Sequence, residues 1–267
     1  MFARKRFGQN FLHDPGVIRR IVQSVAPRPG EAVVEIGPGR GAITRPLLAA
    51  CGRLDAVEID RDLIALLRDP GAGLAGLTVH EGDVLRFDFR ALARERGQRL
   101  RVVGNLPYNI STPLIFHLLD QIDALADMHF MLQREVAARM AAAPGGGDYG
   151  RLTVMLAAQV AVTPLFHIAP GCFAPAPQVE SAFVRLVPHA APPFALPDPV
   201  LYAKLVSAAF SQRRKTLRNA LKGLAGEAQI RAAGLDPGAR PETIEPTGYA
   251  ALASVLCDET PSHGTSP

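Results

Sequence analysis

Four short apolar runs, each followed by polar or glycine residues, constrain the fold of this chain more than any other feature. They occupy residues 32–36, 54–59, 77–81 and 101–104. Apolar runs of this length that alternate with helical patterns are typical of buried parallel strands. In a doubly wound sheet the carboxyl ends of such strands meet along one edge, where ligands bind. The sequence therefore predicts an α/β fold whose chemistry lies in the loops after these runs.

The first three loops carry residue types suited to an adenosine-type ligand. Gly37 and Gly39 allow a tight turn and the close approach of a ligand to a helix N-terminus. Glu58 stands where an acid can accept hydrogen bonds from ribose hydroxyls. The carboxylate of Asp83 and the backbone N–H of Val84 can hydrogen-bond an adenine. The glycine pattern also satisfies the dinucleotide form G-x-G-x-x-A, so a nicotinamide enzyme is an alternative at this point.

The fourth loop suits the holding of a flat base by its exocyclic amine. The lone pair of adenine N6 is delocalised into the ring, which makes this nitrogen a poor nucleophile. Two acceptors, the Asn105 side-chain oxygen and the Leu106 carbonyl, would draw the amine towards tetrahedral geometry and localise that lone pair. Pro107 stiffens the turn, and Tyr108 offers a ring on which an unstacked base can lie. A plain strand-to-helix loop, with Asn as a cap, is the alternative.

The second half of the chain predicts the end of the sheet and a separate helical region. Residues 160–168 and 181–187 indicate two last strands that form a hairpin. Between them, alternating prolines make the chain rigid and extended, so Phe173 is a candidate second aromatic beside the base; loop packing explains it equally well. After a proline-rich linker, helical patterns cover residues 201–210, 216–224 and 249–257.

Basic charge is concentrated in this helical region. The whole chain of 267 residues has a net charge of only +4, a mild bias towards polyanions. Residues 199–226 contain no Asp or Glu, which favours phosphate contact over a merely solvated face. The candidate RNA-binding residues are Arg213, Arg214, Lys215, Arg218 and Lys222.

Cysteine usage and hydropathy predict a cytoplasmic protein. The three cysteines are widely spaced and lack a paired-ligand pattern, so we expect free thiols in a reducing compartment and no metal site. The basic N-terminus lacks an apolar signal core, and no run approaches a membrane span. Nothing in the sequence requires a dimer, so we expect a monomer.

Assembled, these stretches resemble the KsgA (RsmA) family of small-subunit ribosomal RNA adenine dimethyltransferases. The resemblance covers nearly the whole chain and rests on eight motifs in the order of the family. The motifs are residues 4–12 (RKRFGQNFL), 35–39 (EIGPG), 58–60 (EID), 82–83 (GD), 105–111 (NLPYNIS), 149–152 (YGRL), 173–179 (FAPAPQV) and 212–219 (QRRKTLRN). Erm-type 23S rRNA methyltransferases share the first domain, but residues 113–117 and 212–219 favour the small-subunit enzyme.

The resemblance implies a Rossmann-like class I methyltransferase sheet with helices on both faces, plus a small all-helical C-terminal domain. We expect a methyltransferase domain with an N-terminal arm over residues 1–187 and a proline-rich linker over 188–199. A helical RNA-binding domain over 200–257 and a disordered tail over 258–267 should follow.

The resemblance also implies a reaction. Family members place two methyl groups on each of two adjacent adenines in the terminal hairpin of 16S rRNA, acting on an assembling small (30S) subunit. Direct in-line transfer from the sulfonium of S-adenosylmethionine to adenine N6 is expected, without a covalent enzyme intermediate. The expected cofactor-binding residues are Asn10, Leu12, Gly37, Gly39, Glu58, Asp83, Val84 and Asn105. A second class of function is left open: an assembly checkpoint that docks through the basic helical domain, with methylation secondary.

Overall fold

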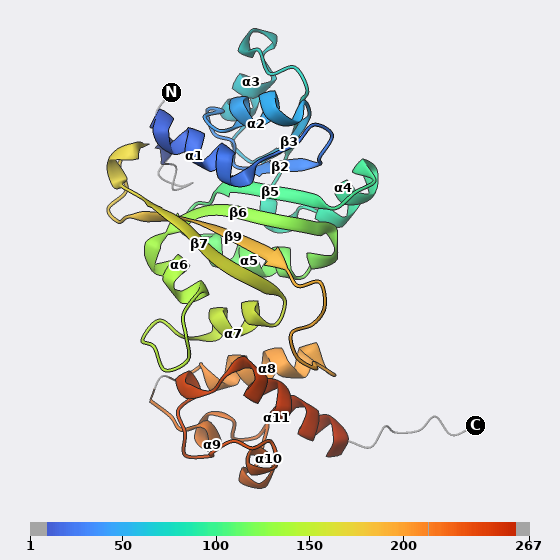
Figure 1. The fold of residues 1–267 in the computed structure, drawn as a ribbon, viewed down its shortest axis with the longest axis vertical. Helices are drawn as coiled ribbons and strands as arrows, with labels where there is room; N and C mark the ends of the chain where they lie inside the picture. The colour runs from blue at the N-terminus through green and yellow to red at the C-terminus, as the bar shows by residue number, and fades with distance from the viewer. Residues whose placement is uncertain (1–9, 213, 260–267) are drawn as a thin grey trace, which may run out of the picture. The chain divides into compact units, whose positions relative to one another are not determined.

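The computed structural model describes residues 10–212 and 214–259, and a seven-stranded sheet is the main feature of this part of the chain (Figure 1). Its strand order is β4-β3-β2-β5-β6-β9-β7. The strands are β2 (Val33–Ile36), β3 (Leu54–Glu58), β4 (Leu77–Glu81), β5 (Leu100–Asn105), β6 (Leu125–Gln133), β7 (Val160–Ile168) and β9 (Ser181–Pro188). Two short strands, β1 (Phe11–Leu12) and β8 (Phe173–Ala174), form a separate antiparallel pair. The predicted strands are confirmed, and β7 lies beside β9 at the edge of the sheet.

Helices lie on both faces of the sheet, as the predicted fold class requires (Figure 1). The helices of the described residues are α1 (Pro15–Val25), α2 (Thr44–Cys51), α3 (Arg61–Arg68), α4 (Phe89–Arg96), α5 (Ser111–Leu119), α6 (Arg134–Met140), α7 (Arg151–Ala157), α8 (Pro199–Ala209), α9 (Leu217–Ala220), α10 (Glu227–Ala232) and α11 (Pro246–Glu259). The predicted helix over 216–224 is shorter than expected, because the chain leaves helical geometry before Gly223, whose φ is +87°. None of the described helices has the length and apolar character needed to cross a membrane.

The sheet brings the predicted loops to one edge. Strands β4, β3, β2, β5 and β6 run parallel, and β9 returns antiparallel to β6. The chain runs from β2 outwards to β4 and returns to β5 on the other side of β2, so the strand order reverses at this point. Open sheets bind ligands in the crevice at such a reversal. Ile36 lies level with both Val57 and Gly104, so Gly37, Glu58 and Asn105 follow at one height.

Strands β2 and β5 approach each other closely at Gly104, the residue before Asn105. A Cβ atom there would lie 2.9 Å from the Ile36 carbonyl oxygen and 3.1 Å from a methyl carbon of Leu106. Any side chain would therefore push the two strands apart or displace Leu106. Glycine at this position keeps the loop after β5 against the end of β2.

The chain forms two compact units. One contains the described residues up to Ala137 together with Val162–Pro188, and the other contains Ala138–Ala161 and the described residues from His189 onwards. The expected methyltransferase domain over residues 1–187 includes residues 138–161. These residues are grouped with the second unit, although Val160 and Ala161 begin β7 of the sheet. The buried Tyr202 hydroxyl donates to the Val154 carbonyl at 3.0 Å, and the Tyr149 hydroxyl donates to the Ile244 carbonyl at 2.8 Å. These bonds satisfy buried phenols and tie the segment to that core.

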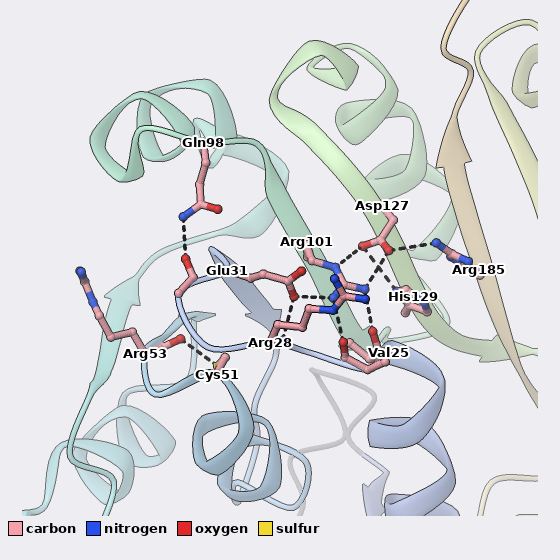
Figure 2. A network of polar contacts seen from close by, with 12 residues as sticks. Val25, Arg28, Glu31, Cys51, Arg53, Gln98, Arg101, Asp127, His129 and Arg185 are labelled. Atoms are coloured by element: carbon pink, nitrogen blue, oxygen red, sulfur yellow. Dashed lines mark hydrogen bonds and ion pairs between the residues drawn. The ribbon is translucent and has the colours of Figure 1, made fainter.

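An ion-pair network ties α1 to the amino-terminal ends of β5 and β6 (Figure 2). The Arg101 guanidinium donates to Asp127 at 2.9 and 3.0 Å and to Glu31 at 2.6 Å. It also donates to the Val25 carbonyl at 2.6 Å, one of the helix-end carbonyls that lack a partner within α1. The network therefore anchors the helix that follows the N-terminal segment.

His129 in β6 lies buried beside this network (Figure 2). Its ring stacks on Phe183 with the ring centroids 6.0 Å apart, and neither ring nitrogen has a hydrogen-bond partner among the described residues. Burial lowers the pKa of His129 to about 4, against the opposing effect of the Asp127 carboxylate 3.8 Å away. Arg101 and Arg185 add to the lowering. The ring is therefore neutral at neutral pH.

We predict that His129 makes the fold acid-sensitive between pH 6.5 and about pH 4. In this window an unfolded histidine binds a proton that the folded site excludes, so the free energy of unfolding falls as the pH falls. The contribution is fully present above pH 6.5 and is lost as the pH approaches 4. The slope of unfolding free energy against pH should be smaller in His129→Leu. Urea unfolding followed by circular dichroism measures it, since the chain has no tryptophan.

The control is His167→Leu, which changes an exposed residue of β7 and should keep the wild-type slope. A wild-type slope in His129→Leu would contradict the prediction.

Candidate active site

A cavity of about 380 Å³ lies at the carboxyl edge of the sheet in the first unit. It is lined by the loops after β2, β3, β4 and β5 and by the N-terminal segment around β1. The structure brings together every residue expected to bind the cofactor: Asn10, Leu12, Gly37, Gly39, Glu58, Asp83, Val84 and Asn105. Leu106, Pro107 and Tyr108 line the same cavity.

The glycine loop after β2 has an open side and a covered side. Gly37 and Gly39 have φ values of +63° and +58°, a region that favours glycine. A Cβ atom at Gly37 would meet nothing within 4 Å, so this side is open to a ligand. At Gly39 a Cβ atom would lie 3.2 Å from the ring of Phe11, and the Arg40 guanidinium lies 4.6 Å from the centre of that ring. The N-terminal segment thus covers one part of the loop.

Asn105 is oriented by the same N-terminal segment. Its side-chain Nδ2 donates to the Asn10 carbonyl at 2.9 Å, so the donor end of the amide is engaged within the protein. The other end, Oδ1, can only accept hydrogen bonds. Next to it, the Leu106 side chain is buried and its backbone N–H donates to the Met131 carbonyl at 3.0 Å. The bond to Asn10 therefore uses one of the two Nδ2 hydrogens and leaves the Oδ1 acceptor for a ligand.

Tyr108 is half-buried and bonded at two places. Its hydroxyl lies 2.9 Å from the Ser181 Oγ, and its carbonyl accepts from the Ser111 hydroxyl at 3.1 Å. The turn over residues 107–110 is closed by a hydrogen bond from the Ile110 N–H to the Pro107 carbonyl at 3.1 Å. These contacts fix both the backbone and the ring of a residue that lines the cavity.

Glu58 is a buried carboxylate that holds two loops in place. Its Oε1 accepts from the backbone N–H groups of Ile59 and Asp60 at 3.0 Å each, and its Oε2 accepts from the Gly39 N–H at 3.4 Å. Burial raises the pKa of Glu58, against the effect of these donors. Asp83 accepts from the Leu85 N–H at 3.0 Å and so caps the following turn while it lines the cavity.

Glu35 is a cavity residue that the sequence reasoning did not single out. It is 1% exposed, and its Oε2 has no hydrogen-bond partner among the described residues. Burial raises the pKa of Glu35 to about 8, and the neighbouring Glu58 adds to this, whereas the Thr44 hydroxyl lowers it. The sequence does carry one signal for this residue, an acid near the end of a buried apolar strand. Acids are rarely buried without a binding partner, because burial of an unpaired charge is costly.

Phe173 is not among the residues that line the cavity. Its side chain is buried in the core that also contains Leu12, the residue opposite it in the β1–β8 pair. The neighbouring Ala174 lines the cavity instead. The position of Phe173 supports packing between the N-terminal segment and the proline-rich segment, the alternative left open by the sequence.

The basic cluster belongs to the second unit. Arg214, Lys215, Arg218 and Lys222 are exposed there, and Arg213 lies outside the described residues. Arg218 pairs with Glu227 at 3.0 Å, an acid just beyond the acid-free stretch. Part of the positive charge is therefore compensated.

The chain is similar to known rRNA methyltransferases along nearly its whole length. Among curated proteins it is 54% identical over 257 residues to the ribosomal RNA small subunit methyltransferase A of Pseudomonas fluorescens, which covers 96% of this chain and 95% of that protein. It is 57% identical over 252 residues to the ribosomal RNA small subunit methyltransferase A of Nitrosococcus oceani, with 94% of each chain covered.

Solved structures show the same relationship. The 23S rRNA methyltransferase ErmE superposes with a TM-score of 0.70 at 27% identity and covers 93% of this chain and 100% of its own. A dimethyladenosine transferase from Plasmodium falciparum superposes with a TM-score of 0.75 at 25% identity and covers 93% of this chain and 98% of its own. The family model described as Ribosomal RNA adenine dimethylase matches residues 2–256. On this match and these identities, the chain belongs to the ribosomal RNA adenine dimethylase family.

Proposed function

We propose that this protein dimethylates N6 of two adjacent adenines in the 3′-terminal hairpin of 16S rRNA. It acts on the assembling small ribosomal subunit, as a monomer in the cytoplasm, where its three free cysteines stay reduced. The observation that carries this proposal is the orientation of Asn105. Its donor end is bonded to the Asn10 carbonyl, so its oxygen is left to accept from an exocyclic amine.

The methyl donor of the family is S-adenosylmethionine, and two features of the cavity fit it. The open side of Gly37 leaves room for a ligand against the backbone. The buried Oε2 of Glu35, which lacks a partner among the described residues, matches a ligand that carries positive charge. The residues that would hold the cofactor are Asn10, Leu12, Gly37, Gly39, Glu35, Glu58, Asp83, Val84 and Asn105.

The residues after β5 prepare the adenine amine. When bound, S-adenosylmethionine supplies an electrophilic methyl group on a sulfonium that leaves as a neutral thioether, so no residue need protonate the leaving group. The Asn105 Oδ1 and the Leu106 carbonyl would each accept one N6 hydrogen and localise the nitrogen lone pair. The Tyr108 ring would stack on the base, a contact worth about 1–3 kcal/mol. As the N–C bond forms, the electron pair of the broken S–C bond passes to sulfur, and the methylated N6 then loses one proton to water. The protein contributes the positioning and polarisation of N6.

The second methylation meets a changed amine. One N6 hydrogen has been replaced by a methyl group, so one of the two acceptors loses its partner. The methyl group also needs space beside the buried Leu106. The orientation of the base then depends more on stacking against Tyr108 and less on hydrogen bonds to the two acceptors.

We predict that labelled methyl groups pass from S-adenosylmethionine to two adjacent 16S adenines of under-methylated small subunits, as dimethyladenine. Transfer to 23S rRNA and duplex DNA, measured alongside, should be absent. Label on 23S rRNA alone would assign the protein to Erm-type activity. Binding to subunits without any label would favour the docking function.

In the same assay Asn105→Ala should lower kcat on the order of 100- to 1,000-fold, the range for removing one preorganised polar group at a reacting centre. Cofactor affinity should change far less. The matched control is Gln98→Ala, because the Gln98 amide also donates to a backbone carbonyl, that of Gly30 at 2.8 Å, before the start of β5. Full activity in Asn105→Ala would refute the assignment.

We predict that cofactor binding releases a proton from Glu35. The pKa of Glu35 near 8 leaves the free carboxyl largely protonated at pH 7, and a cationic ligand favours its ionised form. The affinity for S-adenosylmethionine should therefore rise with pH until about pH 8. Calorimetry at pH 7 in buffers of different ionisation enthalpy measures the released proton.

Glu35→Gln should bind more weakly at pH 8 and release less of a proton. The control Glu95→Gln changes an acid whose side chain is 64% exposed and should behave as wild type. Equal proton release in wild type and Glu35→Gln would show that another group titrates.

We further propose that the exposed basic residues of the second unit bind rRNA phosphates. Removing Arg214, Lys215 and Lys222 together by substitution with Gln should weaken RNA binding and reduce the slope of log affinity against log salt. Each phosphate contact contributes about 0.7–0.9 to this slope. Arg218→Gln should lower RNA affinity less than a single substitution of Arg214, Lys215 or Lys222 by Gln, since Arg218 already pairs with Glu227. An unchanged salt slope in the triple variant would contradict the proposal.

A further inference from the structure

The hydroxyl of Tyr108 makes a contact that stacking does not require. A phenylalanine ring would offer the same face to a base, yet the phenol reaches the Ser181 Oγ at 2.9 Å. Ser181 is 1% exposed, whereas Tyr108 is half-buried at the cavity. The phenol is therefore bonded to a group inside the protein, which removes freedom of rotation from the ring.

The position of Ser181 is itself fixed by its neighbours. It is the first residue of β9 and pairs with Gln133 at the end of β6. The preceding residue, Glu180, accepts from the Arg134 backbone N–H at 2.9 Å and from the Arg134 side chain at 2.6 Å. The serine hydroxyl is thus held on the sheet, and the ring of Tyr108 is tied to the sheet through it.

Two separate anchors therefore act on the loop after β5. The Asn10 carbonyl sets the direction of the Asn105 amide, and the Ser181 hydroxyl sets the ring of Tyr108. A base that stacks on this ring presents its edge to Asn105 only if the two side chains keep their relative orientation. The rate of methyl transfer depends steeply on such alignment.

We propose that Ser181 is a positioning residue, which holds the Tyr108 ring so that a stacked adenine presents N6 to Asn105. This inference rests on the proposed function. Its effect is greatest on the second methylation, because N6-methyladenine has lost one hydrogen bond to the acceptors and is oriented more by the ring. Ser181 thereby favours dimethyladenine over release of the monomethylated product.

Single-turnover methylation of under-methylated small subunits tests this with Ser181→Ala, Tyr108→Phe and the double variant. Each single variant should slow the second transfer by about three- to tenfold, the range for one lost hydrogen bond, and slow the first transfer less. Monomethyladenine should accumulate in both. The double variant should be no slower than the slower single variant, because both substitutions break the same bond.

Ser181→Thr keeps the hydroxyl and should restore the dimethyl product, whereas a purely steric role would not be rescued in this way. Ser24→Ala, which also removes a serine hydrogen bond, to the Arg20 carbonyl, is the matched control and should behave as wild type. Cofactor affinity and melting temperature should stay near wild type in Ser181→Thr and Tyr108→Phe.

The inference would be overturned if the double variant slowed the second transfer by the product of the two single effects. A wild-type ratio of dimethyladenine to monomethyladenine in Tyr108→Phe would also overturn it. Absence of 16S labelling by the wild-type protein would instead overturn the proposed function, so the two failures are distinguishable.

Discussion

The parallel pairing of β2 with both β3 and β5 is the constraint on which the site depends. Because Ile36 lies level with Val57 and Gly104, three loops leave the sheet at one height. Gly104 allows the close approach of β2 and β5 that this register needs, since even a Cβ atom would reach the Ile36 carbonyl. A slip of one residue would turn Asn105 to the opposite face. Backbone pairing therefore sets where this loop lies, and side-chain contacts set the orientation of its polar groups.

Segments distant in sequence then set the orientation of the side chains in this loop. Asn105 is held by the Asn10 carbonyl, and Tyr108 is bonded to Ser181. The two holding segments are joined through the β1–β8 pair, in which Leu12 lies opposite Phe173. Burial of Phe173 thus serves the site indirectly, by joining the N-terminal segment to the proline-rich segment.

The buried ionisable groups of the first unit differ in whether their polar atoms have hydrogen-bond partners. Glu58 is satisfied by three backbone N–H donors, while Glu35 keeps one oxygen without a partner among the described residues. Such an orphaned group costs about 1–3 kcal/mol, and a cationic ligand relieves that cost. His129 has two nitrogens in the same condition, yet it lies beside the Arg101 network and not among the residues that line the cavity. At His129 the unpaired nitrogens therefore have no ligand to relieve them, and their burial makes the fold sensitive to acid.

By itself the sequence determined the strands, the loops that carry the site and the family. Apolar periodicity and turn residues are local properties, so the glycine loop, Glu58, Asp83 and the stretch from Asn105 to Tyr108 were predictable. The tertiary structure alone decided the direction of the Asn105 amide, the bond between Tyr108 and Ser181 and the burial of Phe173. It also left the buried Oε2 of Glu35 without a hydrogen-bond partner among the described residues. Packing in the tertiary structure also groups residues 138–159 with the C-terminal helices. These features depend on which distant side chains and backbone groups meet, and a pattern read along one chain does not contain that information.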